Sequence, residues 1–135
     1  MNLATSADRS PFQWNAGGWL GAQLGGTGWL LGGALYMLLS APEVSVIWFA
    51  GFVILNAIGW ALWRRRERLR AHTAIQLLLA AIGIVGLVAW TALLQLRPDI
   101  PRKELWPTSY WPLAIIPAMM LWFAIREHLS RRPAV

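Results

Sequence analysis

The fold is decided by residues 44–63, VSVIWFAGFVILNAIGWALW, and by the basic run RRRERLR that follows at residues 64–70. The first stretch has 20 residues without a charge. About 20 apolar residues are what an α-helix needs to cross a hydrocarbon core roughly 30 Å thick. A helix on the surface of a soluble domain shows a polar face instead. Residues 44–63 therefore predict a transmembrane helix that ends at a cluster of five arginines.

Three further charge-free runs accompany this stretch. They cover residues 10–42, 71–96 and 105–125, and the four runs together contain 100 of the 135 residues. Backbone polar groups in lipid must form their hydrogen bonds within the chain, which favours helices. We therefore predict an all-α membrane protein with four transmembrane helices in an up-down bundle.

The predicted segments alternate between lipid and water. The order is a cytoplasmic or interfacial segment at 1–17, spans at 18–39 and 44–63, a basic cytoplasmic loop at 64–72, a span at 73–96, a proline-rich extracytoplasmic loop at 97–108, a span at 109–125 and a basic cytoplasmic tail at 126–135. The four residues between the first two spans predict an antiparallel hairpin. In the last span, Pro117 near the centre predicts a kink.

The basic residues predict the orientation of the chain. With the N-terminus inside, nine of the 12 Lys and Arg residues lie on the cytoplasmic side, against Arg97, Arg102 and Lys103 outside. By the positive-inside rule, both termini are therefore cytoplasmic. The loop arginines also suit the headgroups of anionic lipids, each contributing about 1 kcal/mol near a charged leaflet. These residues are Arg64, Arg65, Arg66, Arg68 and Arg70.

Glycines dominate the first span, which reads GGWLGAQLGGTGWLLGG over residues 17–33. On a helix, Gly21, Gly25, Gly28 and Gly32 fall within about 60° of one another. Gly17, Gly21 and Gly25 also repeat the small-xxx-small spacing at which membrane helices approach closely. The pattern predicts helix packing along this glycine stripe, and a substrate path through the groove is the alternative.

The opposite face of the same span is polar. Gln23 and Thr27 lie there about 160° from the stripe, and Asn56 of the second span is expected at a similar depth. Amide groups in hydrocarbon need partners. We therefore predict a hydrogen bond between Gln23 and Asn56, worth about 0.6–2 kcal/mol in membranes. The functional alternative is a small polar site at mid-membrane.

Several function classes are disfavoured. The chain has no cysteine, which excludes thiolate catalysis and cysteine-ligated metals. The predicted spans contain no Asp, Glu, Lys or Arg, the residues on which ion-coupled transport relies. His72 and His128 are expected at the cytoplasmic ends of spans, where metal or haem ligation is the minor alternative. The net charge of +6 lies at span ends rather than on a soluble face, which argues against nucleic acid. We expect no enzyme activity, no catalytic residue, no cofactor and no metal.

Three segments carry a resemblance. They are GGWLGAQLGGTGWLL, NAIGWALWRRRERL and AIQLLLAAIG, within residues 17–83. This part of the chain resembles a group of small uncharacterised bacterial inner-membrane proteins with a Gly/Trp-rich first span. The resemblance implies a bacterial plasma membrane and carries no activity.

Two functions from different classes fit these features. The first is a non-enzymatic accessory or scaffold protein that packs its glycine stripe against a second copy or a membrane-protein partner. The second is an oligomeric channel or carrier for a neutral or weakly charged small solute, lined by Gln23, Thr27 and Asn56. Burial of these three side chains against one another favours the scaffold, and a water-lined stripe favours transport.

Overall fold

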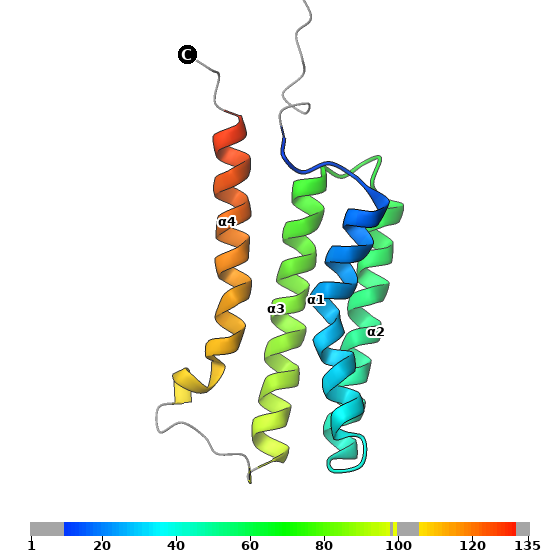
Figure 1. Ribbon diagram of the computed structural model, residues 1–135, viewed down its shortest axis with the longest axis vertical. Coiled ribbons are helices and arrows are strands. Elements are labelled where there is room, and N and C mark those ends of the chain that lie inside the picture. The colour runs from blue at the N-terminus through cyan, green and yellow to red at the C-terminus, as the bar shows by residue number, and fades with distance from the viewer. Residues whose placement is uncertain (1–9, 98, 100–105, 132–135) are drawn as a thin grey trace, which may run out of the picture.

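The computed structural model describes residues 10–97, 99 and 106–131, and this part of the chain is all-helical, as predicted (Figure 1). Its elements are α1 (Ala16–Met37), α2 (Pro42–Arg64), α3 (Ala71–Leu96), the 3-10 helix η1 (Trp106–Ala114) and α4 (Ile115–Ser130). Successive α-helices run in opposite directions (Figure 1). The start of α1, the arginine-rich α2–α3 loop and the end of α4 therefore lie at one end of the molecule, called the basic end below.

Three helices are long and apolar enough to cross a membrane: Pro42–Arg64, Ala71–Leu96 and Ser109–Ser130. The chain is thus compatible with a membrane protein. The 22 residues of α1 carry no charge, but eight are glycine and one is Gln23, which lowers the hydropathy of this helix. Membrane crossing by α1 stays a prediction.

Local sequence signals set the ends of the first two helices. The side chain of Asn15 caps α1 by accepting a hydrogen bond from the Gly18 N–H at 3.1 Å. Pro42 occupies the first turn of α2, where its missing N–H costs nothing. Between them, the hydroxyl of Ser45 donates to the Ala34 carbonyl at 2.7 Å and is buried. The predicted hairpin of the first two spans is therefore present.

The core lies between α1, α2 and α3, where Leu30 and Leu55 are fully buried. A Cβ built on Gly33 would collide with the ring of Trp48, so that this glycine admits the indole between α1 and α2. The indole N–H of Trp48 reaches on to α3 and donates to the Ala89 carbonyl at 2.9 Å. One tryptophan thus joins three helices.

The fourth predicted span differs from its prediction at both ends. It begins as a 3-10 helix, continues as α4 from Ile115, and extends to Ser130, five residues into the predicted tail. Pro117 is the third residue of α4, so its missing N–H falls in the first turn and the kink predicted at mid-span is wrong. The chain instead changes direction where η1 meets α4 (Figure 1). Of the predicted loop at 97–108, residues 98 and 100–105 lie outside the described part of the chain.

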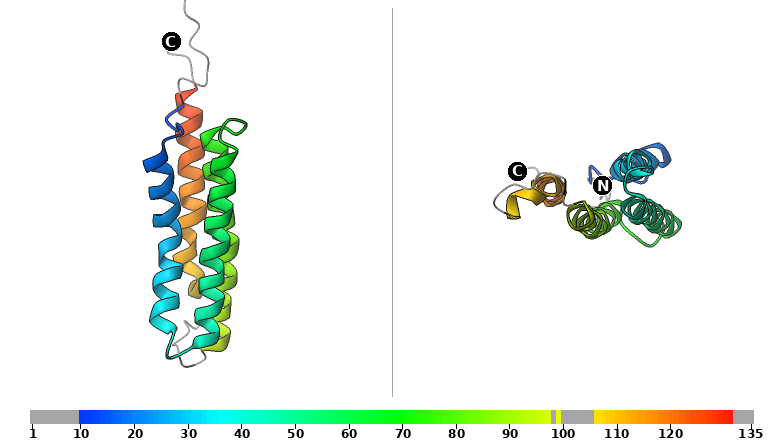
Figure 2. Two further views of the ribbon diagram at one scale, coloured as in Figure 1. Left: turned by 90° about the vertical axis from the view of Figure 1, so that its right-hand side faces the viewer. Right: turned by 90° about the horizontal axis from the view of Figure 1, so that it is seen from below.

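Helix α4 stands apart from the compact group of α1, α2 and α3. It packs on α3, and within the described residues it makes no backbone approach to α1 or α2. Seen along the helix axes, α1, α3 and α4 surround a concave side of the molecule (Figure 2). This arrangement leaves one face of α1 uncovered.

Candidate functional site

The three polar residues predicted at mid-membrane meet between α1 and α2. The Nε2 group of Gln23 donates to Oδ1 of Asn56 at 2.9 Å, as predicted, and lies 3.1 Å from the Asn56 carbonyl oxygen. The amide of Asn56 donates in turn to the Thr27 hydroxyl at 3.2 Å, and this hydroxyl donates to the Gln23 carbonyl at 2.8 Å. The three side chains therefore form one connected network.

Two of the three residues of this network are buried, and Asn56 is partly buried. Thr27 is fully buried and Gln23 is 7% exposed. A Cβ on Gly59 would collide with the Gln23 side chain, so the bare backbone of α2 makes room for the amide. Among the described residues, no buried side-chain nitrogen or oxygen lacks a partner. The network joins α1 and α2 through hydrogen bonds between their side chains.

The glycine stripe lies on the other side of α1 and touches nothing. A Cβ built on Gly21, Gly25, Gly28 or Gly32 would have no neighbouring atom within 4 Å. Gly17, at the start of the helix, would meet only the Asn15 side chain. Within the chain, close helix contacts instead use Gly33, which lies on α1 away from the stripe, and Gly59 of α2. Packing of the stripe against another molecule stays a prediction.

An apolar groove of about 620 Å³ runs beside the stripe, between α1, α3 and α4. Each of its 16 lining residues is glycine, alanine, proline, methionine or a large apolar residue. Trp29 and Trp90 line it, but their indole N–H groups are already bonded to the carbonyls of Gly26 and Ser109, at 3.0 and 2.8 Å. The groove therefore offers carbon surface with no free donor from these indoles.

The groove is narrowed at the end remote from the arginines. There, Leu113 of η1 and Trp29 of α1 both approach Gly86 of α3, and each would lie 3.4 Å from a Cβ at that position. At the basic end, the last lining residues are Ile75 and Phe123. Laterally the groove opens between α1 and α4.

The segment before α1 crosses the basic end of the groove and is called the strap (residues 10–15). The ring of Phe12 lies between His72 of α3 and Phe123 of α4, with centroids 5.4 and 5.2 Å apart. The hydroxyl of Ser10 donates to Oε2 of Glu127 at 2.6 Å, and the indole of Trp14 donates to the Leu69 carbonyl at 2.9 Å. The strap thus links α1, α3 and α4 to one another.

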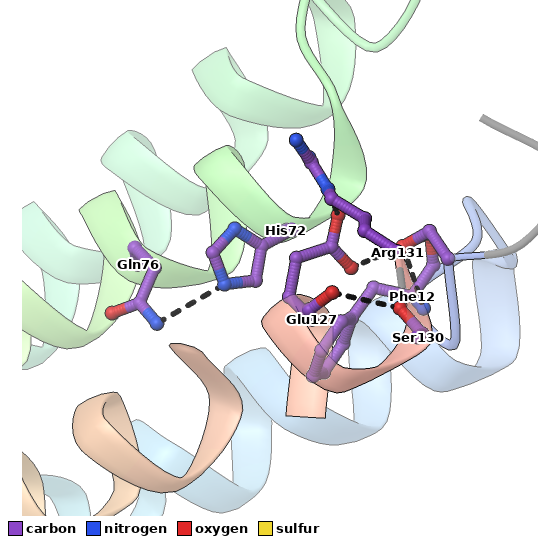
Figure 3. A network of polar contacts seen from close by, with 7 residues as sticks. Phe12, His72, Gln76, Glu127, Ser130 and Arg131 are labelled. Carbon is purple, nitrogen blue, oxygen red and sulfur yellow. Dashed lines mark hydrogen bonds and ion pairs between the residues drawn. The ribbon is translucent and has the colours of Figure 1, made fainter. Parts of the chain in front are cut away.

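Glu127 is the polar anchor of the strap. Its side chain is 7% exposed, and its Oε1 accepts two hydrogen bonds from Arg131 at 2.7 and 3.0 Å (Figure 3). His72 lies beside it and contacts Gln76, whose amide donates to the Met120 carbonyl at 2.9 Å (Figure 3). Both oxygens of the buried carboxylate are therefore bonded, and a neighbouring guanidinium balances its charge.

The two histidines differ in their surroundings. His128 is exposed, whereas His72 lies against Phe12. Within residues 10–97, 99 and 106–131, no three His, Cys, Asp or Glu residues lie close enough together to hold a metal ion. The arginines of the α2–α3 loop are exposed at the basic end, and Arg66 stacks over the Trp63 ring with 5.0 Å to its centroid.

Sequence reasoning missed the strap and the groove. Ser10 and Glu127 are 117 residues apart, and no local pattern predicts contact over such a distance. The only available signal was Glu127 itself, an acidic residue within a basic tail.

Comparisons with protein-family models, curated proteins and solved structures give no match for this chain. The function is therefore inferred from the contacts within the chain itself.

Proposed function

We propose that this chain is a multi-pass protein of a bacterial plasma membrane that acts without catalysis, as an accessory or scaffold protein. In this proposal α1 is the fourth membrane span, both termini are cytoplasmic and the loop arginines contact anionic headgroups. The glycine stripe packs against a helix of a second copy or of another membrane protein.

The observation that carries this proposal is the contrast between the two faces of α1. Its polar face is closed by α2, with Gln23 and Thr27 buried and hydrogen-bonded. Its glycine face is bare over Gly21, Gly25, Gly28 and Gly32. Eight glycines weaken a helix by up to about 1 kcal/mol each relative to alanine. A stripe that costs stability and contacts nothing within the chain suits a contact between chains.

The test is copurification from mildly solubilised membranes, followed by identification of the associated proteins. Gly28→Leu should fold normally, because its side chain enters open space, and should reduce the associated species at least about tenfold, since a leucine holds two helices apart. Ala50→Leu is the matched control, as Ala50 is an exposed small residue on α2. Association that survives Gly28→Leu and Gly32→Leu unchanged would contradict the proposal.

The channel alternative gains no support from the network between α1 and α2, because its polar groups are engaged with one another. A liposome assay separates the two functions. The scaffold function expects no passage of water or a small neutral solute through the reconstituted protein. Reproducible passage that Gln23→Leu combined with Asn56→Leu abolishes would reverse the ranking.

A further inference from the structure

The shape of the groove between α1, α3 and α4 limits what can occupy it. Its lining runs from Ile75 to Trp90 along α3, a rise of 15 residues that spans about 22 Å at 1.5 Å per residue. The volume of the groove is about 620 Å³. The groove is therefore elongated along the helix axes, over most of a hydrocarbon core that is roughly 30 Å thick.

The lining of this elongated groove suits a hydrocarbon chain, because apolar side chains contact methylene groups without leaving a polar group unpaired. The lining has no charged or hydrogen-bonding side chain apart from two engaged indoles. The space therefore suits one extended apolar chain.

A free positive charge lies at the basic end of this groove. Arg126 follows the lining residues Met119 and Ile115 by seven and 11 residues, which places it within about 20° of both on α4. Arg126 is exposed and forms no ion pair with any described residue, unlike its neighbour Arg131, which is paired with Glu127. A cation is thus available where a headgroup of the adjacent leaflet would lie.

We propose that the groove binds one acyl chain of an anionic phospholipid, with the lipid phosphate at Arg126. The chain enters laterally between α1 and α4, because the strap crosses the end of the groove through Phe12. The bare backbone at Gly21 and Gly25 lets the chain lie against α1. The proposal does not rest on the scaffold function: the acyl chain covers Gly21 and Gly25, and Gly28 and Gly32, which lie outside the groove, stay open to a partner helix.

Native mass spectrometry of the full-length protein in mild detergent tests this assignment, with phosphatidylglycerol and phosphatidylcholine as probes. The unmodified protein should retain one phosphatidylglycerol per chain and bind phosphatidylcholine about tenfold more weakly. Ala22→Phe and Met119→Trp fill the groove from opposite walls. Each should weaken binding of both lipids at least about tenfold, the effect of losing about two buried methylene groups.

Matched variants test the acyl-chain site in the groove and the headgroup site at Arg126 separately. Leu24→Phe enlarges an exposed residue of α1 outside the groove and should leave lipid binding unchanged. Arg126→Gln should remove the preference for phosphatidylglycerol, whereas Arg97→Gln should keep it, because Arg97 follows the far end of α3 and is paired with Asp99.

Three outcomes would overturn the assignment. If the unmodified protein and all variants bound several lipids equally well, the bound lipid would be only annular lipid, which surrounds any membrane protein. Equal binding of the two lipids by the unmodified protein would show that the protein does not recognise an anionic headgroup. A lipid-free dimer that Ala22→Phe dissociates would assign the groove to a second copy. Circular dichroism shows whether each variant folds. Because Ala22 and Met119 are two independent positions in the groove, the test still holds if one of these two variants does not fold.

Discussion

At the scale of single residues, the polar contact between α1 and α2 was accessible from the sequence. Gln23 and Asn56 lie on adjacent helices joined by a four-residue turn, so the position of each along the helix pair follows from counting residues. The contacts of the glycines, in contrast, could not be predicted from the sequence. Gly32 and Gly33 are neighbours in sequence, yet one faces open space and the other faces the Trp48 ring. Residue type alone does not distinguish them, because the missing side chain is equally compatible with a contact and with a bare surface.

The polar network yields a prediction about paired substitutions. Gln23→Leu leaves Oδ1 of Asn56 without its donor, and Asn56→Leu leaves the Gln23 amide with only a backbone acceptor. Each single change should lower the free energy of unfolding by about 1–3 kcal/mol, whereas the double change should cost less than the sum, since it removes both partners. Denaturation in detergent micelles, followed by circular dichroism, measures the four values. If the loss of stability in the double variant equalled the sum of the losses in the two single variants, the two side chains would not interact.

The adjacent glycines of α1 provide a matched pair. Gly33→Ala should destabilise the fold by about 1–3 kcal/mol, because its methyl group meets the ring of Trp48, which is itself held by the Ala89 carbonyl. Gly32→Ala should be neutral or stabilising by up to about 1 kcal/mol, because alanine favours helix and nothing lies within 4 Å. Thermal unfolding of both variants is the measurement. A similar loss of stability in the two would contradict the assignment of the closed face.

At the scale of elements, α4 is the least constrained helix. It packs on α3 and is otherwise held by the strap, through Phe12 and Glu127. The sequence predicted an apolar segment here but placed the bend at Pro117. In the structure the bend lies where η1 meets α4, and Pro117 is the third residue of α4. Such a shift depends on where the helix begins, and helix starts are poorly defined by composition.

Removing the ring of Phe12 should therefore loosen α4 selectively. In Phe12→Ala, amide hydrogen exchange in α4 should accelerate about tenfold, equivalent to about 1.4 kcal/mol of local opening. Exchange in α2 should not change, since α2 has no contact with the strap through this ring. Phe49→Ala, which truncates an exposed phenylalanine of α2, is the control. Equal acceleration in α2 and α4 would mean that Phe12 supports the whole fold and not the attachment of one helix.

At the scale of the whole molecule, composition defines the helices but does not define how they assemble. Lipid tails are as apolar as leucine side chains, so a lipid-facing residue and a helix-facing residue look alike in sequence. Leu30 is fully buried, whereas Leu24, on the same helix, is 54% exposed. For this reason the groove and the separation of α4 could not be predicted, although each of the four α-helices was. The positions of the charged residues, in contrast, show directly which segments lie at the ends of the molecule.

The charge distribution yields the last prediction, that the basic end is cytoplasmic. A reporter enzyme that is active only outside the cytoplasm, fused to the C-terminus, should give no signal, because nine of the 12 basic residues lie on the predicted cytoplasmic side. Replacing Arg64, Arg65 and Arg66 together reduces the excess from nine against three to six against three, and should yield a minority of inverted molecules. Replacing Arg102 and Lys103 instead raises the bias to nine against one and should leave the reporter silent. A strong signal from the unmodified fusion would place the arginine-rich loop outside, and Arg126 would then face the opposite leaflet.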